Sequence, residues 1–271
     1  MFFDFHTHVF PDKIAEMAVA SLVEKAEGAI GEKGCLTAHT NGTLAGLKRS
    51  MERGGVDGSL ILPVCTDPKQ FDSVNRFAAE INGEDGIYSF GGIHPDCEDI
   101  DGKMSFIKKS GFLGVKIHPD YQDTYIDDEK YVKILECAKE YDLIVVTHSG
   151  VDGAYRQTVR CTPDRALNLI RKVSHSKLVL AHLGANELYG EVLDRLCGED
   201  VYFDTAYVLR FVNQELFQAI IQKHGSDKIL FGSDSPWSHI RNDVEILKSF
   251  GLKQETERKI FCENAKKLLG I

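Results

Sequence analysis

The stretch that decides the fold is Asp4-Phe5-His6-Thr7-His8, at the end of a short apolar run near the start of the chain. Side chains on a β-strand alternate between its two faces, so His6 and His8 leave the strand on the same side. Two imidazoles placed in this way are near enough to share one metal ion. Further ligands would have to come from other strand ends, as they do in barrel enzymes.

Eight short runs rich in β-branched and aromatic residues occur along the chain, and a longer segment with helical periodicity follows each of them. The apolar stretch Leu-Ile-Val-Val at residues 143–146 is typical of strands that are buried on both faces in a parallel sheet. This alternation predicts a single-domain (β/α)8 TIM barrel, of the α/β class, over residues 1–271. The runs are residues 2–8, 59–65, 87–94, 113–118, 143–148, 178–183, 201–206 and 229–234.

Helix boundaries are predicted from capping residues. Thr43 is expected to begin a helix that ends at Gly54. Two others are expected to begin at Asp127 and at Thr162, and the latter has a proline in its first helical position.

Polar side chains that could hold or flank a metal ion stand at the ends of several other runs. Lys116 lies at the end of the fourth run, His148 of the fifth, His182 of the sixth and Asp234 of the eighth. In a closed barrel these ends share one edge, where catalytic residues gather. An open doubly wound sheet is the competing architecture, but it would place its ligand at a switch in strand order and predicts no such ring. The distribution therefore favours the barrel.

Composition and charge narrow the classes of partner. Of the 271 residues, 43% are apolar and 27% are charged, and the net charge is -9. Nucleic acid or an anionic membrane surface would require a basic face, so a small-molecule substrate is the expected partner. A homodimer is left open as the assembly. No apolar run is long enough to cross a bilayer and no leader follows Met1, so a soluble, cytoplasmic enzyme is expected.

The seven cysteines show no Cys-x-x-Cys spacing, which predicts neither a disulfide framework nor a thiolate zinc site and fits a reducing compartment. A thiol nucleophile at Cys65 or Cys97 is an alternative, but no pattern places a base beside either thiol.

Five motifs stand in order at the strand ends. They are Asp4-Phe5-His6-Thr7-His8, Gly114-Val115-Lys116-Ile117-His118-Pro119, Thr147-His148-Ser149-Gly150, Leu180-Ala181-His182-Leu183-Gly184 and Phe231-Gly232-Ser233-Asp234-Ser235-Pro236-Trp237. Together they resemble the amidohydrolase superfamily of metal-dependent barrels, and the resemblance runs from end to end of the chain. The most similar branch is the amidohydrolase-related one that holds aminocarboxymuconate semialdehyde decarboxylase.

The resemblance implies a metal centre at one end of the barrel. Its ligands would be His6, His8, His148 and Asp234, a nitrogen-rich set suited to zinc or another divalent ion. One ion per chain is favoured. His182 would then stay off the ion and stabilise developing charge, while Asp234 would act as the general base.

A two-metal site is the alternative. There His182 would bind a second ion, and Lys116 would bridge the two ions if its amine were carboxylated, because a plain ammonium cannot ligate a metal. In the one-metal site Lys116 would contact the substrate instead. His118, which is followed by a proline, is expected to orient a substrate carbonyl.

Three more residues are expected to bind the substrate. Arg156 after the fifth run and Arg241 after the eighth could pair bidentately with a substrate carboxylate, and Trp237 could pack against its apolar part. Asp4 lies deeper in its strand, so a hydrogen bond is expected of it rather than ligation. Loops at residues 9–42, 119–126 and 150–162 should set specificity.

The expected function is metal-dependent hydrolysis, in which a metal-activated water cleaves an amide or ester bond, cyclic ones included, of a small carboxylate-bearing substrate. The alternative is a metal-dependent, non-oxidative decarboxylase of an unsaturated or aromatic acid, in which Asp234 delivers a proton. A barrel that binds a metal or metabolite without turnover is the third reading, and it gives no reason for a full set of ligands.

Overall fold

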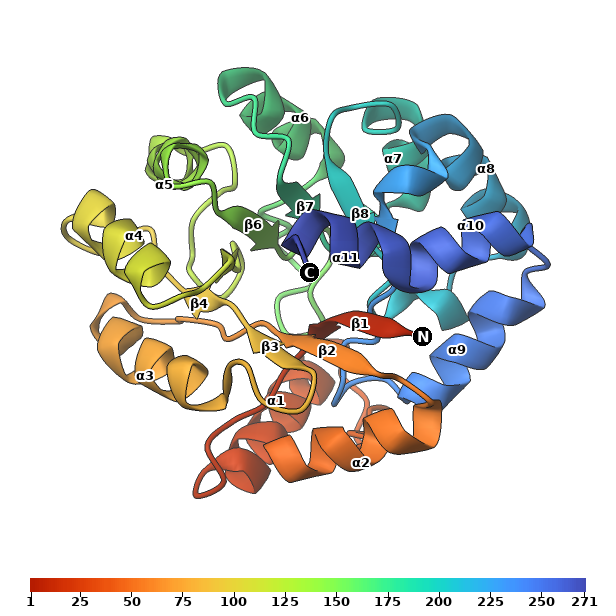
Figure 1. Ribbon diagram of the computed structural model, residues 1–271, viewed down its shortest axis with the longest axis horizontal. Coiled ribbons are helices and arrows are strands. Elements are labelled where there is room, and N and C mark those ends of the chain that lie inside the picture. The colour runs from red at the N-terminus through yellow and green to blue at the C-terminus, as the bar shows by residue number, and fades with distance from the viewer.

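The computed structural model describes residues 1–271, and its strands run parallel around a barrel with helices outside it (Figure 1). Each of the eight predicted runs contains a strand, which confirms the (β/α)8 barrel, although the third run is divided into two short strands. The strands are β1 (Phe3–Thr7), β2 (Gly58–Ile61), β3 (Ile87–Ser89), β4 (Gly91–Gly92), β5 (Gly114–Ile117), β6 (Ile144–Thr147), β7 (Leu178–Leu180), β8 (Tyr202–Asp204) and β9 (Ile229–Leu230).

The strands form two sheets, and hydrogen bonds at two places join these sheets into a closed barrel. Hydrogen bonds join β1, β2 and β3 in one sheet and β4 to β9 in another. The Phe90 amide, between β3 and β4, donates to the Ile61 carbonyl of β2 at 3.0 Å. On the opposite side the Phe5 amide of β1 donates to the Phe231 carbonyl, just after β9, at 2.8 Å. The first and last strands therefore lie side by side, which brings distant parts of the sequence into one site.

Several of the helices begin where a capping side chain accepts a hydrogen bond from a free backbone amide. Thr43 and Thr162 cap their helices through side-chain oxygens, as predicted. The helix expected to begin at Asp127 begins one residue later. Asp128 caps it, because the Asp127 carboxylate is bound by the Arg165 guanidinium at 2.7 Å. The helices are α1 (Ala15–Ile30), α2 (Leu44–Gly54), α3 (Phe71–Ile81), α4 (Ile100–Lys109), α5 (Glu129–Glu140), α6 (Pro163–Lys172), α7 (Tyr189–Arg195), α8 (Gln214–His224), α9 (Ile240–Ser249), α10 (Gln254–Arg258) and α11 (Asn264–Leu269).

Apolar side chains fill the interior of the barrel at one end. Phe3, Phe5 and Phe90 pack there with Leu268 and Leu269 of α11, which crosses this end close to both termini (Figure 1). We call this sealed end the floor, and the opposite end, where the strands have their carboxyl ends, the mouth. Because the floor is apolar, a polar site has room only at the mouth.

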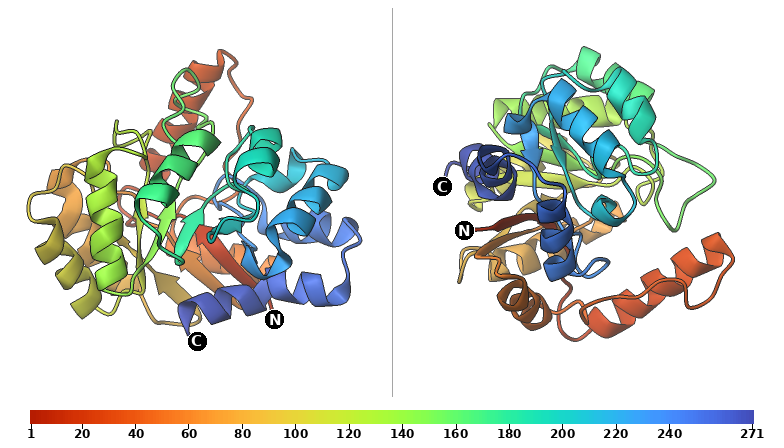
Figure 2. Two further views of the ribbon diagram at one scale, coloured as in Figure 1. Left: turned by 90° about the horizontal axis from the view of Figure 1, so that it is seen from above. Right: turned by 90° about the vertical axis from the view of Figure 1, so that its right-hand side faces the viewer.

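A helix lies in the first segment that was expected to be a loop. Within residues 9–42, α1 projects at the end of the molecule away from the termini, on the mouth side (Figure 2). It buries Ala15, Val19 and Ala26, which share one face at helical spacing. The Lys25 ammonium donates to the Tyr155 hydroxyl at 2.5 Å, in the loop after β6. Two of the segments predicted to set specificity are therefore in contact.

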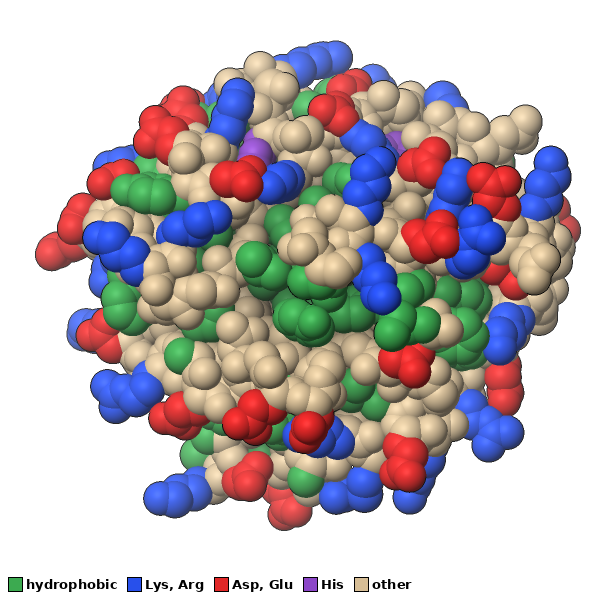
Figure 3. All heavy atoms as spheres, viewed as in Figure 1, with side chains coloured by type: hydrophobic (Ala, Val, Ile, Leu, Met, Phe, Trp, Pro, Cys, Tyr) green, Lys and Arg blue, Asp and Glu red, His purple; other side chains and the backbone are tan.

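The face seen in Figure 3 carries acidic and basic side chains interspersed around a central apolar strip. Such mixing is ordinary for a globular surface. None of the helices combines the length and the apolar composition that a bilayer crossing requires.

Candidate active site and metal centre

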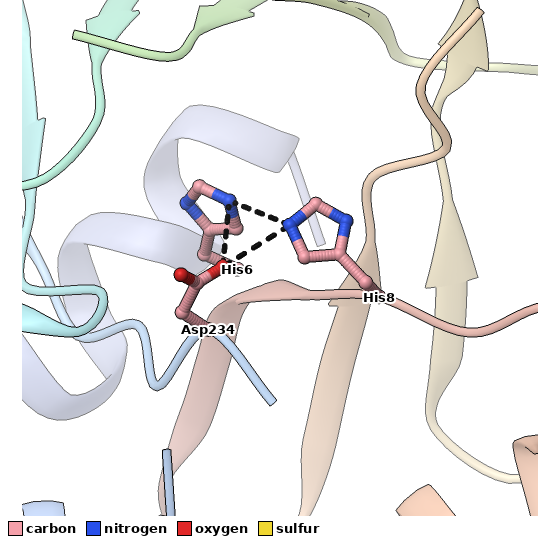
Figure 4. Close-up of side chains that lie close together, drawn as sticks. All are labelled: His6, His8 and Asp234. Carbon is pink, nitrogen blue, oxygen red and sulfur yellow. Dashed lines mark hydrogen bonds and ion pairs between the residues drawn. The ribbon is translucent and has the colours of Figure 1, made fainter. Parts of the chain in front are cut away.

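His6, His8 and Asp234 converge at the mouth, and we call them the metal trio (Figure 4). His6 Nε2 lies 3.2 Å from His8 Nε2 and 3.5 Å from Asp234 Oδ1, and the last two atoms are 3.1 Å apart. Ligands bound to one zinc ion at about 2.0–2.1 Å in a tetrahedron lie roughly 3.3–3.4 Å apart. The three atoms therefore have the spacing of three ligands of one ion.

In each imidazole of the trio, the hydrogen bond made by Nδ1 decides which ring nitrogen carries the proton. His6 Nδ1 donates to Asp204 Oδ2 at 2.8 Å, and His8 Nδ1 donates to the Leu62 carbonyl at 2.8 Å. In a neutral imidazole the other nitrogen then has no proton and carries a free lone pair. Burial, and after it the charge of Lys116, hold the pKa of His6 well below its usual range, so that ring is neutral. Two lone pairs and a carboxylate oxygen face one another, and this set fits a divalent metal ion.

His148 and His182 lie beside the trio but bond to each other. His182 Nδ1 donates to the Ala206 carbonyl at 2.9 Å, so its Nε2 accepts from His148 Nδ1, also at 2.9 Å. The His182 ring centre lies 5.3 Å from that of His6. Of the five residues expected to ligate a metal, the structure thus places three together and sets His148 and His182 against one another next to them.

Lys116 reaches the trio from β5. Its ammonium is buried and donates to His6 Nε2 at 3.2 Å. Burial lowers the pKa of Lys116 to about 8, against the opposing attraction of Asp204 and Asp234. The amine is therefore a buried proton donor in contact with the trio. Carboxylation of Lys116 remains a prediction.

Asp234 is an ionised carboxylate at neutral pH. Burial by itself would raise its pKa, but the neighbouring imidazole of His8, and after it those of His6 and His182, outweigh this effect and lower the pKa to about 2. Both imidazole contacts go to Oδ1, which leaves Oδ2 to exchange a proton. An ionised Asp234 can accept a proton directly, and it must take one up before it can deliver one.

Backbone strain marks the same positions. His182 and Asp234 both have positive φ angles, 60° and 67°, which residues with a side chain adopt rarely. The Asp234 amide donates to the His6 carbonyl at 2.8 Å, and this contact between neighbouring strand ends holds the strained turn in place. Strain of this kind is concentrated at functional sites.

Asp204 contacts the site, although none of the five motifs includes it. It is fully buried at the end of β8. Its Oδ1 accepts from the amides of His182 and Ala206, while Oδ2 accepts from His6 Nδ1. This carboxylate orients two histidines at once and sets the proton position on one of them. The available signal was an aspartate at the end of the seventh apolar run.

Two more aspartates, the buried Asp120 and the partly buried Asp152, lie near His148 and His118. Burial raises the pKa of Asp120 to about 7 and also raises that of Asp152. Neither has a predicted role, because neither belongs to a strand-end motif. Asp4 accepts hydrogen bonds from the Ser233 amide and hydroxyl, in agreement with the expectation that it would not ligate.

The residues expected to bind substrate lie in different settings. His118 stacks on His148 with ring centres 4.2 Å apart. Trp237 follows the turn of Asp234, and its amide donates to the Asp234 carbonyl at 2.8 Å. The two arginines are already paired: Arg156 binds both oxygens of Glu187, and Arg241 binds Glu245 of its own helix, and each side chain is more than a third exposed. The roles of all four at the substrate stay predictions.

The family of the chain follows from a sequence comparison. A family model described as amidohydrolase matches residues 3–271, so the protein belongs to the amidohydrolase family. This confirms the resemblance seen in the five motifs. No curated protein matches the chain.

Solved structures with the same fold cover nearly the whole chain. A dihydroxybenzoic acid decarboxylase from Polaromonas with bound manganese is 16% identical, with a TM-score of 0.72 over 99% of this chain and 96% of that one. A 5-carboxyvanillate decarboxylase from Novosphingobium aromaticivorans, also with manganese, is 14% identical, with a TM-score of 0.73 over 100% and 97%. A putative 2-pyrone-4,6-dicarboxylic acid hydrolase from Pseudomonas putida is 16% identical, with a TM-score of 0.68 over 99% and 97%.

These comparisons correct the expected function. The sequence was interpreted as that of a hydrolase, but the similar structures are mostly of decarboxylases. They favour the alternative reading, a metal-dependent decarboxylase. The protein is an enzyme of the amidohydrolase superfamily, and the motifs that identify the superfamily are shared by hydrolases and lyases alike. For that reason the motifs could not separate the two chemistries.

Proposed function

We propose that the protein is a metal-dependent, non-oxidative decarboxylase of a small aromatic or unsaturated carboxylic acid. The observation that carries this proposal is the likeness, over the whole chain, to decarboxylases of dihydroxybenzoic acid and 5-carboxyvanillate. The metal trio supports it, because two imidazole lone pairs and a carboxylate can hold a divalent ion at the mouth.

The chain's own residues supply the proton transfers. A divalent ion held by the trio would bind the substrate's oxygens and offset their negative charge. Asp234, ionised because its pKa is about 2, takes a proton from a substrate hydroxyl or from water. It then delivers this proton to the carbon that carries the carboxylate. The bond to the carboxylate breaks, carbon dioxide leaves, and the electron pair returns to the unsaturated system.

Lys116 and His182 flank this reaction. The Lys116 ammonium stabilises the negative charge that the substrate carries while the carbon is protonated. The His182 ring is held by the Ala206 carbonyl and by His148, and its backbone amide is held by Asp204, so the ring has a fixed orientation beside the trio. We propose that these two residues position the acid, and that Asp234 performs the chemistry.

The test is a panel of hydroxylated benzoates, unsaturated acids, lactones and amides, offered to protein loaded with a divalent metal. We expect carbon dioxide from one of the acids and, in heavy water, one deuterium on the carbon that lost it. Asp234→Asn should lower the rate by about 10³-fold or more. Asp227→Asn, an exposed aspartate paired with Lys259, is the matched control and should keep full activity. Hydrolysis of a lactone or amide without release of carbon dioxide would contradict the proposal.

The identity of the metal is part of the same proposal. The donor set of the trio suits zinc, named from the sequence, as well as manganese, which two similar decarboxylases bind. Removal of the metal with a chelator should abolish turnover. Reloading with zinc or manganese in parallel, with metal content measured for each, would show which ion restores it.

A further inference from the structure

We propose that Tyr207 binds the carboxylate of the substrate through its phenolic hydroxyl and thereby selects acids. This role rests on the decarboxylase activity proposed above, and it belongs to a residue outside the five motifs and the metal trio. Tyr207 lies three residues after the end of β8, at the mouth of the barrel.

The backbone at Tyr207 lies between the turns that carry His182 and Asp234. The carbonyl of the preceding residue, Ala206, accepts from His182 Nδ1 at 2.9 Å. The Tyr207 amide donates at 3.3 Å to the carbonyl of Ser233, which precedes Asp234. These two hydrogen bonds hold Tyr207 beside the reacting groups.

The backbone of Tyr207 is strained. Its φ angle is 68°, in a region that residues with a side chain adopt rarely and glycine adopts freely. A glycine would satisfy the turn, so the presence of a tyrosine points to a use for its side chain. Strain of this kind is concentrated at functional sites.

The hydroxyl of Tyr207 is a free hydrogen-bond donor. It has no partner in the chain, whereas the hydroxyls of Tyr131 and Tyr189 each donate to a side chain. The ring is half-buried, and burial raises the pKa of Tyr207, so the hydroxyl keeps its proton at neutral pH. A neutral donor is therefore available to a ligand at the mouth.

Two arginines lie near this hydroxyl. The Arg210 guanidinium lies over the Tyr207 ring, 4.5 Å from its centre, and lowers the pKa of the phenol against the effect of burial. Arg210 forms no ion pair and donates instead to the Trp237 carbonyl at 2.9 Å. Arg156 also lowers this pKa, but Glu187 already binds it through both oxygens. The unpaired charge of Arg210 therefore favours an anion at the hydroxyl.

A second phenol at the mouth, that of Tyr121, has different surroundings. Burial raises the pKa of Tyr121, and the neighbouring carboxyl groups of Asp152 and Asp120 raise it further. Its ring meets the His118 ring edge-on, with centres 4.3 Å apart. Because carboxylates repel an anion, the acid group of the substrate is expected on the Tyr207 side of the mouth.

A carboxylate held by Tyr207 would be well placed for the proposed reaction. Asp234 delivers its proton to the carbon that carries the carboxylate, so the two groups must be neighbours. The negative charge of Asp234 raises the pKa of Tyr207, which is consistent with a short distance between them. A neutral hydroxyl also orients the leaving carboxylate without the strong pairing of a guanidinium, which would stabilise the acid before its bond breaks.

The experiment compares an acid with the same ring that lacks the carboxylate. Manganese-loaded protein is titrated by calorimetry with 2,6-dihydroxybenzoate and with resorcinol, and we expect the acid to bind about tenfold more tightly or better. Tyr207→Phe removes only the hydroxyl and keeps the ring under Arg210. It should weaken binding of the acid about 10- to 100-fold, the loss of one hydrogen bond to a charged group, and change that of resorcinol less than about twofold.

Tyr202→Phe is the matched control. Tyr202 lies at the other end of β8, with its ring beneath the Lys228 ammonium, so this variant should bind both ligands as the unmodified protein does. Metal content and circular dichroism, measured for each variant, should match those of the unmodified protein.

Three results would overturn the proposal: equal weakening of the acid and of resorcinol in Tyr207→Phe, unchanged binding of the acid in that variant, or equal binding of the two ligands by the unmodified protein. Calorimetry reports binding, whereas the decarboxylase assignment depends on release of carbon dioxide. Release with binding that ignores Tyr207→Phe would refute this role alone. Binding that depends on Tyr207, without release from any acid, would support this role and refute the decarboxylase assignment.

Discussion

The mouth and the floor of the barrel use the same residue type in opposite ways. At the floor, His175 Nε2 donates to the Leu143 carbonyl at 2.9 Å. His224 Nε2 donates to the Val201 carbonyl at 3.0 Å, while its Nδ1 accepts from the Gly198 amide at 3.2 Å. At the mouth, one nitrogen of His6 and of His148 is likewise anchored, but the other faces a further acceptor.

Burial does not distinguish the two regions. It lowers the pKa of His6 and His148 at the mouth and of His175 and His224 at the floor. All four are therefore neutral rings in the folded chain. The two regions differ in what the second ring nitrogen faces. An imidazole whose hydrogen bonds are all made holds a backbone turn in place, whereas an imidazole whose lone pair faces another acceptor can bind a cation.

The largest effect is expected from Asp204→Asn at the mouth. Asparagine keeps one acceptor oxygen, but that oxygen cannot serve both His6 Nδ1 and the backbone amides now bound by the carboxylate. If the new amide group faces His6, it moves the proton of that ring to Nε2 and removes a ligand. Metal affinity should fall about 10- to 100-fold, measured by competition with a chelating dye. The exposed Asp200→Asn is the control. Unchanged affinity would show that the tautomer of His6 is not set by Asp204.

An intermediate effect is expected at the floor from His224. Burial lowers its pKa to about 4, from an ordinary value of 6.5, so as the pH falls the unfolded chain binds the proton first. The stability that neutral His224 contributes is present above pH 6.5 and is lost as the pH falls toward 4. At pH 5 the loss is about 2 kcal/mol. Between pH 7.5 and pH 5, the free energy of unfolding in urea should fall less in His224→Gln than in the unmodified protein, by about this amount. If the free energy of unfolding fell equally in the two proteins, another group than His224 would take up the proton.

The smallest effect concerns the two arginines predicted to hold a substrate carboxylate. Arg156 binds Glu187, in the loop that follows His182, whereas Arg241 is paired within α9. We expect Arg156→Ala to raise the KM for the acid by about tenfold, the value of one charge-assisted hydrogen bond, and Arg241→Ala to leave it within twofold. Both exposed pairs contribute under about 1 kcal/mol to stability. A larger effect of Arg241→Ala on KM would reverse the assignment.

Much of the fold was accessible from the sequence. Every strand overlaps a run that was predicted from apolar, β-branched residues, because a strand buried on both faces leaves a clear local pattern. Helix α1 was not identified within residues 9–42, and its fully buried residues are only Ala15, Val19 and Ala26. The start of α5 was off by one because Asp127 and Asp128 are equal capping candidates, and only the distant Arg165 separates them.

The site was accessible in part. The convergence of His6 and His8 follows from the period of one strand, and that of Asp234 from closure of the barrel. Asp204, Asp120 and Asp152 were not found, because an aspartate in a sequence does not show whether it is buried or what it contacts. The distinction between hydrolase and decarboxylase was also missed, because the motifs concern the metal and not the bond that is broken.

The sequence by itself determined the order of strands and helices and the side on which each strand-end histidine leaves its strand, since both depend on residues within a few positions of one another. The tertiary structure alone decided which atoms face the ring nitrogens of these histidines. Those partners, Asp204 for His6 and Asp120 for His148, are brought close by closure of the barrel and by the loops at its mouth. A long-range contact of this kind has no local pattern, yet it fixes the proton positions from which the chemistry follows.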